Sequence, residues 1–98
     1  MIEIVQGETF RAWLEKLKDR HAKARILARI DRMATGNLGD VKPVGGGLSE
    51  TRIAYGPGYR VYFLQRGDRL IVLLAGGTKK TQPRDIAKAK EIAKDWKE

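Results

Sequence analysis

The amino-acid sequence predicts one small α+β domain over residues 1–98, in which two helices precede an antiparallel sheet and a third helix follows it. Two observations support this fold class. Apolar residues recur at intervals of three and four before residue 34 and again after residue 83, which is the helical period. Between residues 48 and 77 they alternate or form a continuous run, as in strands. The predicted order of elements is β-α-α-β-β-β-α.

The first third of the chain is predicted to be a short strand and two helices. Ile2 and Ile4 alternate with polar residues in the strand. The first helix has an apolar face formed by Phe10, Trp13, Leu14 and Leu17. Asp19 is expected to cap a second helix with the apolar face Ala22, Ile26, Leu27, Ile30 and Met33. Gly36 and Asn37 supply the left-handed conformation that ends this helix.

The middle of the chain is predicted to form the sheet. Residues 38–50 are expected to be a loop or an irregular entry to the first of three strands, which cover residues 48–55, 59–65 and 70–77. A type II turn is expected at Gly56-Pro57-Gly58, with the proline at the first central position. The third strand is so apolar that both of its faces should be buried.

The last element is predicted to be a helix that begins at Pro83, because proline suits the first helical position. Its apolar face is formed by Ile86, Ala89, Ala93 and Trp96. Trp13 and Trp96 are therefore expected to be core anchors rather than ligand contacts.

The composition excludes several classes of site. With no cysteine the chain has no disulfide and no thiolate metal site, and His21, the only histidine, is expected to be an ordinary surface residue. No metal or cofactor is predicted. No apolar run approaches the roughly 20 residues of a membrane helix, and the first residues lack the pattern of a secretory signal. We therefore expect a cytoplasmic protein with no membrane partner.

The net charge of +8 points to an anionic partner. Residues 52–98 contain eleven basic and five acidic residues, so the second half of the chain carries most of the excess. Such a surface attracts nucleic acid, with an affinity that falls as salt rises, and it attracts acidic proteins as well.

A candidate site lies on one face of the predicted hairpin. Alternation places Arg60 and Tyr62 on the face opposite the helix-packed core, and Glu50 and Arg52 of the neighbouring strand share that face. Lys79 and Lys80 follow the last strand and could add to the rim. Guanidinium groups bind phosphate oxygens bidentately, and a tyrosine can stack on a base. The alternative is an exposed sheet face with solvated arginines and an ion pair to Glu50.

Three spaced motifs resemble the HigB-like addiction-module killer proteins, a branch of the RelE/ParE superfamily of toxin–antitoxin systems. They are GN.GD.K at residues 36–42, RI.YGPGYRVYF at 52–63 and GG.K.TQ..DI..A at 76–89, and the resemblance covers nearly the whole chain. It implies a RelE/ParE-like fold, with two N-terminal helices packed on a twisted antiparallel sheet and a C-terminal helix. Thr78 and Thr51 depart from the family pattern, in which an acidic and an apolar residue are usual.

The resemblance also implies an activity. Its members cleave messenger RNA, usually on the ribosome, and are silenced by a cognate antitoxin, commonly of the helix-turn-helix type. In RNA-cleaving relatives the working surface combines basic residues of the central strands with groups after the last strand and in the final helix. The positions that match as catalytic are Arg52, Arg60, Lys79 and Lys80; the expected substrate-binding residues are Tyr62, Glu50 and Arg84.

Two questions stay open at the level of sequence. The general acid and base could be Lys79, Lys80, Tyr62 or Glu50, although an ordinary lysine or tyrosine has too high a pKa to be a good base at neutral pH. The target could also differ, because a ParE-like inhibitor of DNA gyrase and a plain nucleic-acid-binding module would be compatible with the same fold.

Overall fold

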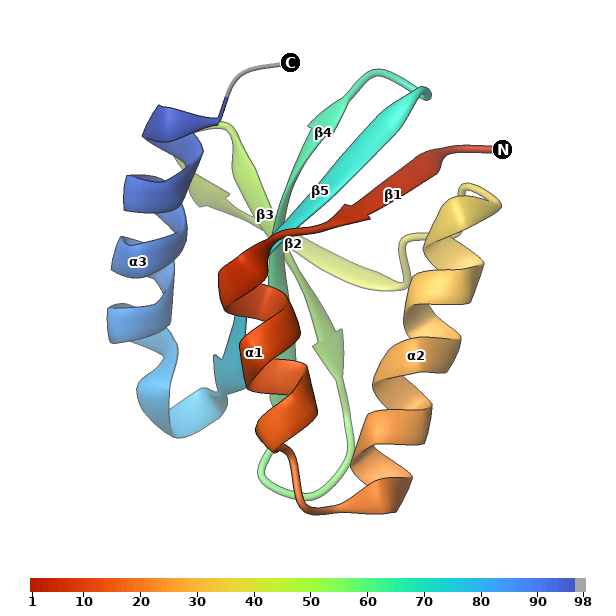
Figure 1. Cartoon of the computed structure of the whole chain (residues 1–98), viewed down its shortest axis with the longest axis vertical. Helices are drawn as coiled ribbons and strands as arrows, with labels where there is room; N and C mark the ends of the chain where they lie inside the picture. The colour runs from red at the N-terminus through yellow and green to blue at the C-terminus, as the bar shows by residue number, and fades with distance from the viewer. Residues whose placement is uncertain (97–98) are drawn as a thin grey trace.

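The structure is a computed structural model that describes residues 1–96, and it confirms the α+β class (Figure 1). Strand β1 (Glu3–Gln6) is followed by helices α1 (Glu8–Lys16) and α2 (Arg20–Ala34). Four consecutive strands come next: β2 (Asp40–Gly45), β3 (Leu48–Ile53), β4 (Tyr59–Arg66) and β5 (Leu70–Thr78). A 3₁₀ turn, η1 (Lys79–Thr81), leads into α3 (Gln82–Asp95). The last two residues of the predicted domain lie outside the described residues.

The five strands form one sheet in the order β1-β5-β4-β3-β2. The prediction of an antiparallel sheet is wrong at one edge, because β1 pairs with β5 in parallel, with Glu3 opposite Leu70. The order of elements also differs by one strand, since residues 40–45 form β2 rather than a loop. Pro43 obscured this strand in the sequence; it is tolerated because β2 is an edge strand with an irregular register after the proline.

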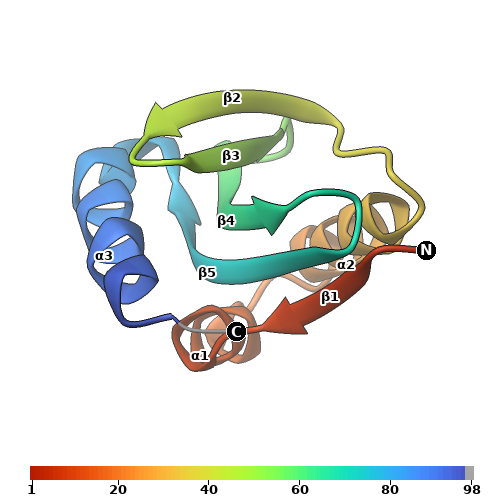
Figure 2. The same cartoon turned by 90° about the horizontal axis from the view of Figure 1, so that it is seen from above.

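Helices cover both faces of the sheet, as Figure 2 shows from above. On one face α1 and α2 pack on a core that includes Phe10, Ile26 and Phe63. On the other face α3 packs on Tyr62 and Leu64. Tyr62 thus lies on the face opposite the core under α1 and α2, as predicted, but α3 makes a second core on that face, which was not predicted. The prediction that the last strand is buried on both faces is confirmed, because every interior residue of β5 is buried.

The helix boundaries follow the predicted capping, except that Asn37 does not adopt the left-handed conformation. The Asp19 side chain accepts hydrogen bonds from the backbone N–H groups of His21 (2.9 Å) and Ala22 (3.1 Å), and Gly36 has the positive φ of a helix stop, 98°. Pro83 lies in the first turn of α3. Trp13 and Trp96 are partly buried at the margins of the two cores.

The turn between β3 and β4 has the predicted positive φ at Gly58, 80°, but its closing hydrogen bond differs from the type II prediction. The Gly58 N–H donates to the Tyr55 carbonyl oxygen over 3.1 Å, so the closed turn covers residues 55–58. Its first central residue is Gly56, with φ of 56°, and Pro57 is the second. A positive φ at the first central residue is the pattern of a type II′ turn, the type that matches the twist of hairpin strands.

Candidate functional site

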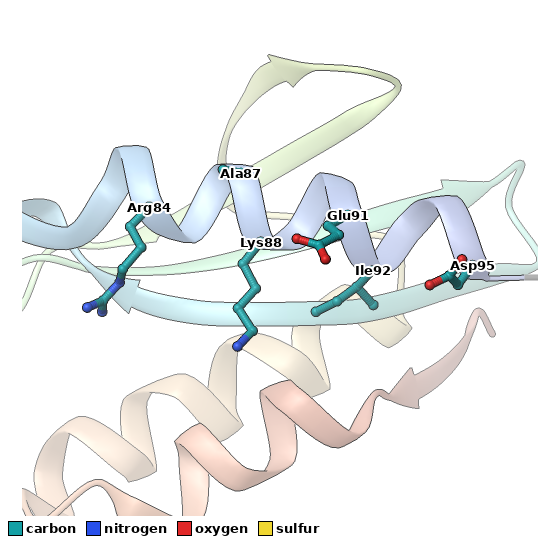
Figure 3. Close-up of a pocket in the computed structure, with 6 residues that line it drawn as sticks. All are labelled: Arg84, Ala87, Lys88, Glu91, Ile92 and Asp95. Atoms are coloured by element: carbon teal, nitrogen blue, oxygen red, sulfur yellow. The ribbon is translucent and has the colours of Figure 1, made fainter.

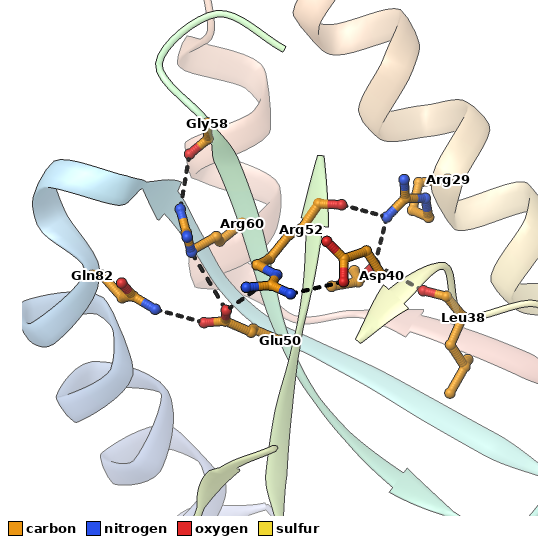
Figure 4. Close-up of polar contacts among 9 residues, drawn as sticks. Arg29, Leu38, Asp40, Glu50, Arg52, Gly58, Arg60 and Gln82 are labelled. Atoms are coloured by element: carbon orange, nitrogen blue, oxygen red, sulfur yellow. Dashed lines mark hydrogen bonds and ion pairs between the residues drawn. The ribbon is translucent and has the colours of Figure 1, made fainter. Parts of the chain in front are cut away.

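The centre of the candidate site is a pair of arginines on neighbouring strands. Arg52 of β3 lies directly opposite Arg60 of β4 in the strand register, as the predicted hairpin required. Both side chains turn toward one oxygen of Glu50: Arg60 Nε lies 3.4 Å from Glu50 Oε2 and Arg52 Nε lies 4.0 Å from it (Figure 4). Two cations thus share one anion on the face that α3 covers.

Glu50 is the internal counterion of this pair. Its side chain is only 1% exposed, and its other oxygen, Oε1, accepts a hydrogen bond of 2.9 Å from Gln82 Nε2 at the start of α3. It therefore joins β3, β4 and α3. A substrate has no access to this carboxylate, so the structure does not support Glu50 as a substrate contact or as the general base.

A second carboxylate, which the sequence reasoning missed, contacts the exposed end of the pair. Asp40 Oδ1 lies 2.8 Å from Arg52 Nη2, and the hydrogen bond from Arg52 holds the pKa of Asp40 below its usual value. Asp40 belongs to β2 and lies opposite Arg52 in the register. Recognition of β2 as a strand would have been the only signal for this contact.

Arg29 supports the site from behind and was also missed. Its Nη1 donates to Thr51 Oγ1 and to the backbone carbonyl of Arg52, both over 2.7 Å, and Thr51 Oγ1 donates to the Leu38 carbonyl over 2.8 Å. Burial and the nearby Arg32 lower the pKa of Arg29. These bonds give the buried Thr51 a structural role and fix the backbone that carries Arg52.

Tyr62 does not occupy the position that the sequence suggested. Its side chain is fully buried, and its hydroxyl has no hydrogen-bond partner among residues 1–96. Burial, followed by the negative charges of Glu50 and Asp85, raises its pKa to about 12. The expected contact between Tyr62 and a substrate is therefore not available in this structure.

The exposed side of the arginine pair opens into a hollow of about 310 Å³, which we call the arginine hollow; its lining includes Asp40, Arg52, Gly58, Tyr59, Arg60 and Lys79. The Gly58 carbonyl accepts hydrogen bonds from the Lys79 backbone N–H (2.9 Å) and from Arg60 Nη1 (3.4 Å). The hairpin turn thus holds Lys79 beside Arg60. Arg60 is 12% and Arg52 38% exposed, so both reach the hollow from a supported position.

The other predicted site residues lie elsewhere. Lys80 is exposed on η1 and does not line the arginine hollow. The Arg84 side chain, 77% exposed, lies on the outer face of α3 (Figure 3). Its Nε is 3.5 Å from the Asp85 carboxylate. Of the predicted cations the structure therefore brings together Arg52, Arg60 and Lys79.

No cluster of potential metal ligands occurs among residues 1–96, where no three His, Cys, Asp or Glu side chains converge. Within the same residues no helix is both long and apolar enough to cross a membrane.

Comparison with known proteins identifies the family. Residues 12–97 match the family model of the phage-derived Gp49-like proteins (DUF891). The chain belongs to this family. The Gp49-like proteins are a RelE-like, toxin-like family. The predicted resemblance to the RelE/ParE superfamily is therefore confirmed at this level. Assignment to the HigB-like branch stays a prediction. An uncharacterized protein of Haemophilus influenzae (strain KW20 / Rd) is 49% identical over 94 residues, which are 96% of this chain and 95% of that protein.

The part of this Gp49-like chain that matches the family model contains the whole candidate site. Every residue that lines the arginine hollow, and both Arg29 and Glu50, fall within residues 12–97. Strand β1 and the first turn of α1 lie before the match. The family assignment therefore rests on the same segments that build the site.

Proposed function

We propose that this Gp49-like protein is the toxin of a type II toxin–antitoxin module, that it cleaves messenger RNA on the ribosome in the cytoplasm, and that a cognate antitoxin silences it. The observation that carries the proposal is the cross-strand pair of Arg52 and Arg60 with Lys79 at its rim. Membership in a toxin-like family supports the toxin role. The charge of the hollow supports an RNA substrate.

The arginine pair suits a phosphate undergoing transfer. Negative charge builds up on the phosphoryl oxygens in the transition state, and preorganised cations stabilise it most effectively when they are held in place before the reaction. Glu50 and Gly58 hold Arg60, while Arg52 has its backbone fixed by Arg29. The guanidinium groups are thus positioned without help from the substrate.

The reaction itself needs no protein nucleophile. The RNA 2′-hydroxyl attacks the adjacent phosphorus, the O2′–P bond forms and the P–O5′ bond breaks. One proton leaves the 2′-hydroxyl and another reaches O5′, so the products are a 2′,3′-cyclic phosphate and a 5′-hydroxyl. The protein contributes alignment of the two oxygens and stabilisation of charge.

The hollow is poorly equipped for the proton transfers. Asp40, the carboxylate that lines it, does not titrate near neutral pH, because Arg52 lowers its pKa. Tyr62 lies outside the lining, and burial raises its pKa to about 12. This weakness is the reason for placing the reaction on the ribosome, which would align the RNA and supply further contacts. Equal cleavage rates on free and ribosome-bound RNA would contradict that part of the proposal.

The test compares three chains induced in a bacterial host: wild type, Arg60→Ala and the matched control Arg11→Ala. Arg11 is an exposed arginine on α1, which packs on the opposite face of the sheet. We expect new 5′ ends inside translated regions within minutes for wild type and Arg11→Ala. Arg60→Ala should reduce their formation by about 100- to 1,000-fold, as loss of a charge-stabilising donor does.

Two further measurements make the result unambiguous. Circular dichroism of the purified variants checks that Arg60→Ala is folded, and Arg60→Lys retains the charge without the bidentate fork and should have intermediate activity. Growth arrest with intact transcripts and damaged DNA would instead favour gyrase inhibition. Binding of RNA without growth arrest would leave only a nucleic-acid-binding module.

A further inference from the structure

The outer face of α3 has an unusual order of charges. Four exposed charged residues share this face with Ala87 and the half-buried Ile92, and together they enclose a shallow hollow of about 390 Å³ (Figure 3). The basic residues, Arg84 and Lys88, lie in the first half of the helix, and the acidic residues, Glu91 and Asp95, lie in the second half.

This order is unfavourable for an isolated helix. Cations are destabilising near the N-terminus of a helix and anions near its C-terminus, because the helix dipole has the same sign there. Arg84 and Lys88 are also like charges at spacing i, i+4, as are Glu91 and Asp95. Among residues 1–96 no ion pair within 4.0 Å involves Lys88, Glu91 or Asp95. Arg84 pairs with Asp85 of its own helix, with Nε 3.5 Å from the carboxylate, whereas the other three charges of the face have no such partner among residues 1–96.

The charges are arranged symmetrically about the middle of the helix. The midpoint between positions 84 and 95 is also the midpoint between 88 and 91, and each of these pairs joins a base with an acid. An antiparallel copy of the same helix would therefore lie with its acidic half over the basic half of the first. A two-fold interface requires such self-complementarity, because the same surface occurs on both sides.

We propose that a second copy of this chain binds to this face, with the two α3 helices antiparallel about a two-fold axis. Arg84 of each chain then faces Asp95 of the other, and Lys88 reaches Glu91 across the contact line. Ala87 and Ile92 supply apolar contact beside the charges. One helix pair is a small interface, so the dimer is weak and sensitive to salt.

The charge pattern favours a second copy over nucleic acid. An RNA strand is uniformly negative, so Glu91 and Asp95 would repel it along half of the face. The face also shares no residue with the lining of the arginine hollow. The dimer is therefore independent of the proposed function and leaves the arginine hollow open.

Sedimentation equilibrium of the full chain, from micromolar to millimolar concentration at low salt, tests the proposal. We expect the average mass of the wild type to rise from the 11.0 kDa of one chain toward twice that value. Asp95→Arg places two arginines opposite each other at both ends of the contact and should weaken association about tenfold. Double reversal with Arg84→Asp and Asp95→Arg restores opposite charges and should restore association.

The variants are chosen so that misfolding or net charge cannot explain the result. Asp95→Arg improves the interaction with the helix dipole, so α3 should be at least as stable as in the wild type. Arg84→Asp also improves it but removes the ion pair with Asp85, so circular dichroism is used to check that the double variant is folded. Asp31→Arg on α2 makes the same change in net charge at another exposed position and should associate like the wild type. A wild type that stays monomeric, an Asp95→Arg variant that dimerises normally, or a double variant that fails to recover would each overturn the proposal.

Discussion

Tyr62 was expected to contact the substrate, but its hydroxyl is buried in the core. The residue lies two positions after Arg60 on β4 and opposite Glu50 in the strand register, and the sequence alone makes it a natural partner for an RNA base. In the structure it belongs to the core under α3, near the carboxylates of Glu50 and Asp85. Its high pKa keeps the hydroxyl protonated at neutral pH.

Tyr62→Phe is therefore expected to leave RNA cleavage unchanged. The substitution removes a buried hydroxyl that has no partner among the described residues, and such a group costs about 1–3 kcal/mol when it is unsatisfied. The free energy of unfolding, measured in urea, should stay equal or rise by about 1 kcal/mol. A loss of cleavage in a folded variant would return Tyr62 to the working site.

At the same scale, the sequence predicts that the two arginines lie opposite each other, but it does not predict which residues contact them. A short hairpin leaves little choice of register, so the opposition of Arg52 and Arg60 followed from strand alternation. The contacts of Asp40 and Arg29 depend instead on how β2 and α2 pack against that hairpin. No local pattern encodes such long-range packing, so these contacts were not predicted.

At the scale of elements, the glycine pair at the end of β5 lets two helices approach the sheet. Gly76 faces α1, and a Cβ there would collide with the Trp13 ring. Gly77 faces α3, and a Cβ there would collide with the Asp85 carboxylate and lie 2.8 Å from Thr81 Oγ1. The two glycines thus allow close contacts on opposite faces of the same strand. This need for small residues is a physical reason for the glycine pair that begins the GG.K.TQ..DI..A motif.

Gly77→Ala is expected to displace the start of α3 and to lower the free energy of unfolding by about 3 kcal/mol, as overpacking of a close contact does. Gly67→Ala is the comparison, because Gly67 has a φ of 57° but nothing within 4 Å of its Cβ position, so only about 1 kcal/mol of backbone strain is expected there. Urea unfolding measures both. Equal losses would show that the contact with Asp85 is easily relaxed.

The helices were predicted correctly from the sequence, whereas two features of the sheet were not. The three helices followed from periodicity, from the cap at Asp19 and from Pro83 in the first turn of α3. Strand β2 was missed because proline and glycine hide a short edge strand, and the parallel pairing of β1 was missed because it joins the two ends of the fold. Edge strands have few apolar residues, so periodicity is a weak signal for them.

At the scale of the whole molecule, the net charge of +8 gives salt-dependent attraction to any polyanion. Salt dependence alone therefore says little about the arginine hollow. The informative quantity is the change in slope when one cation is removed, because each phosphate contact to single-stranded nucleic acid contributes about 0.7 to the slope of log affinity against log salt.

Arg60→Ala should reduce that slope by about 0.7 for a short single-stranded RNA, whereas Arg11→Ala should leave it unchanged. Fluorescence anisotropy at several salt concentrations gives both slopes. Equal slopes for the two variants would mean that RNA binds through diffuse charge and not through the arginine hollow.

The pairing of β1 with β5 has a consequence for the order in which the sheet folds. Glu3 pairs with Leu70, and two helices and three other strands lie between them in the sequence. Contacts between residues so far apart in sequence form slowly, and β1 has no other neighbour in the sheet. Strand β1 therefore joins the sheet late in folding, and because it lines no part of the arginine hollow, fraying of this edge strand leaves Arg52 and Arg60 in place.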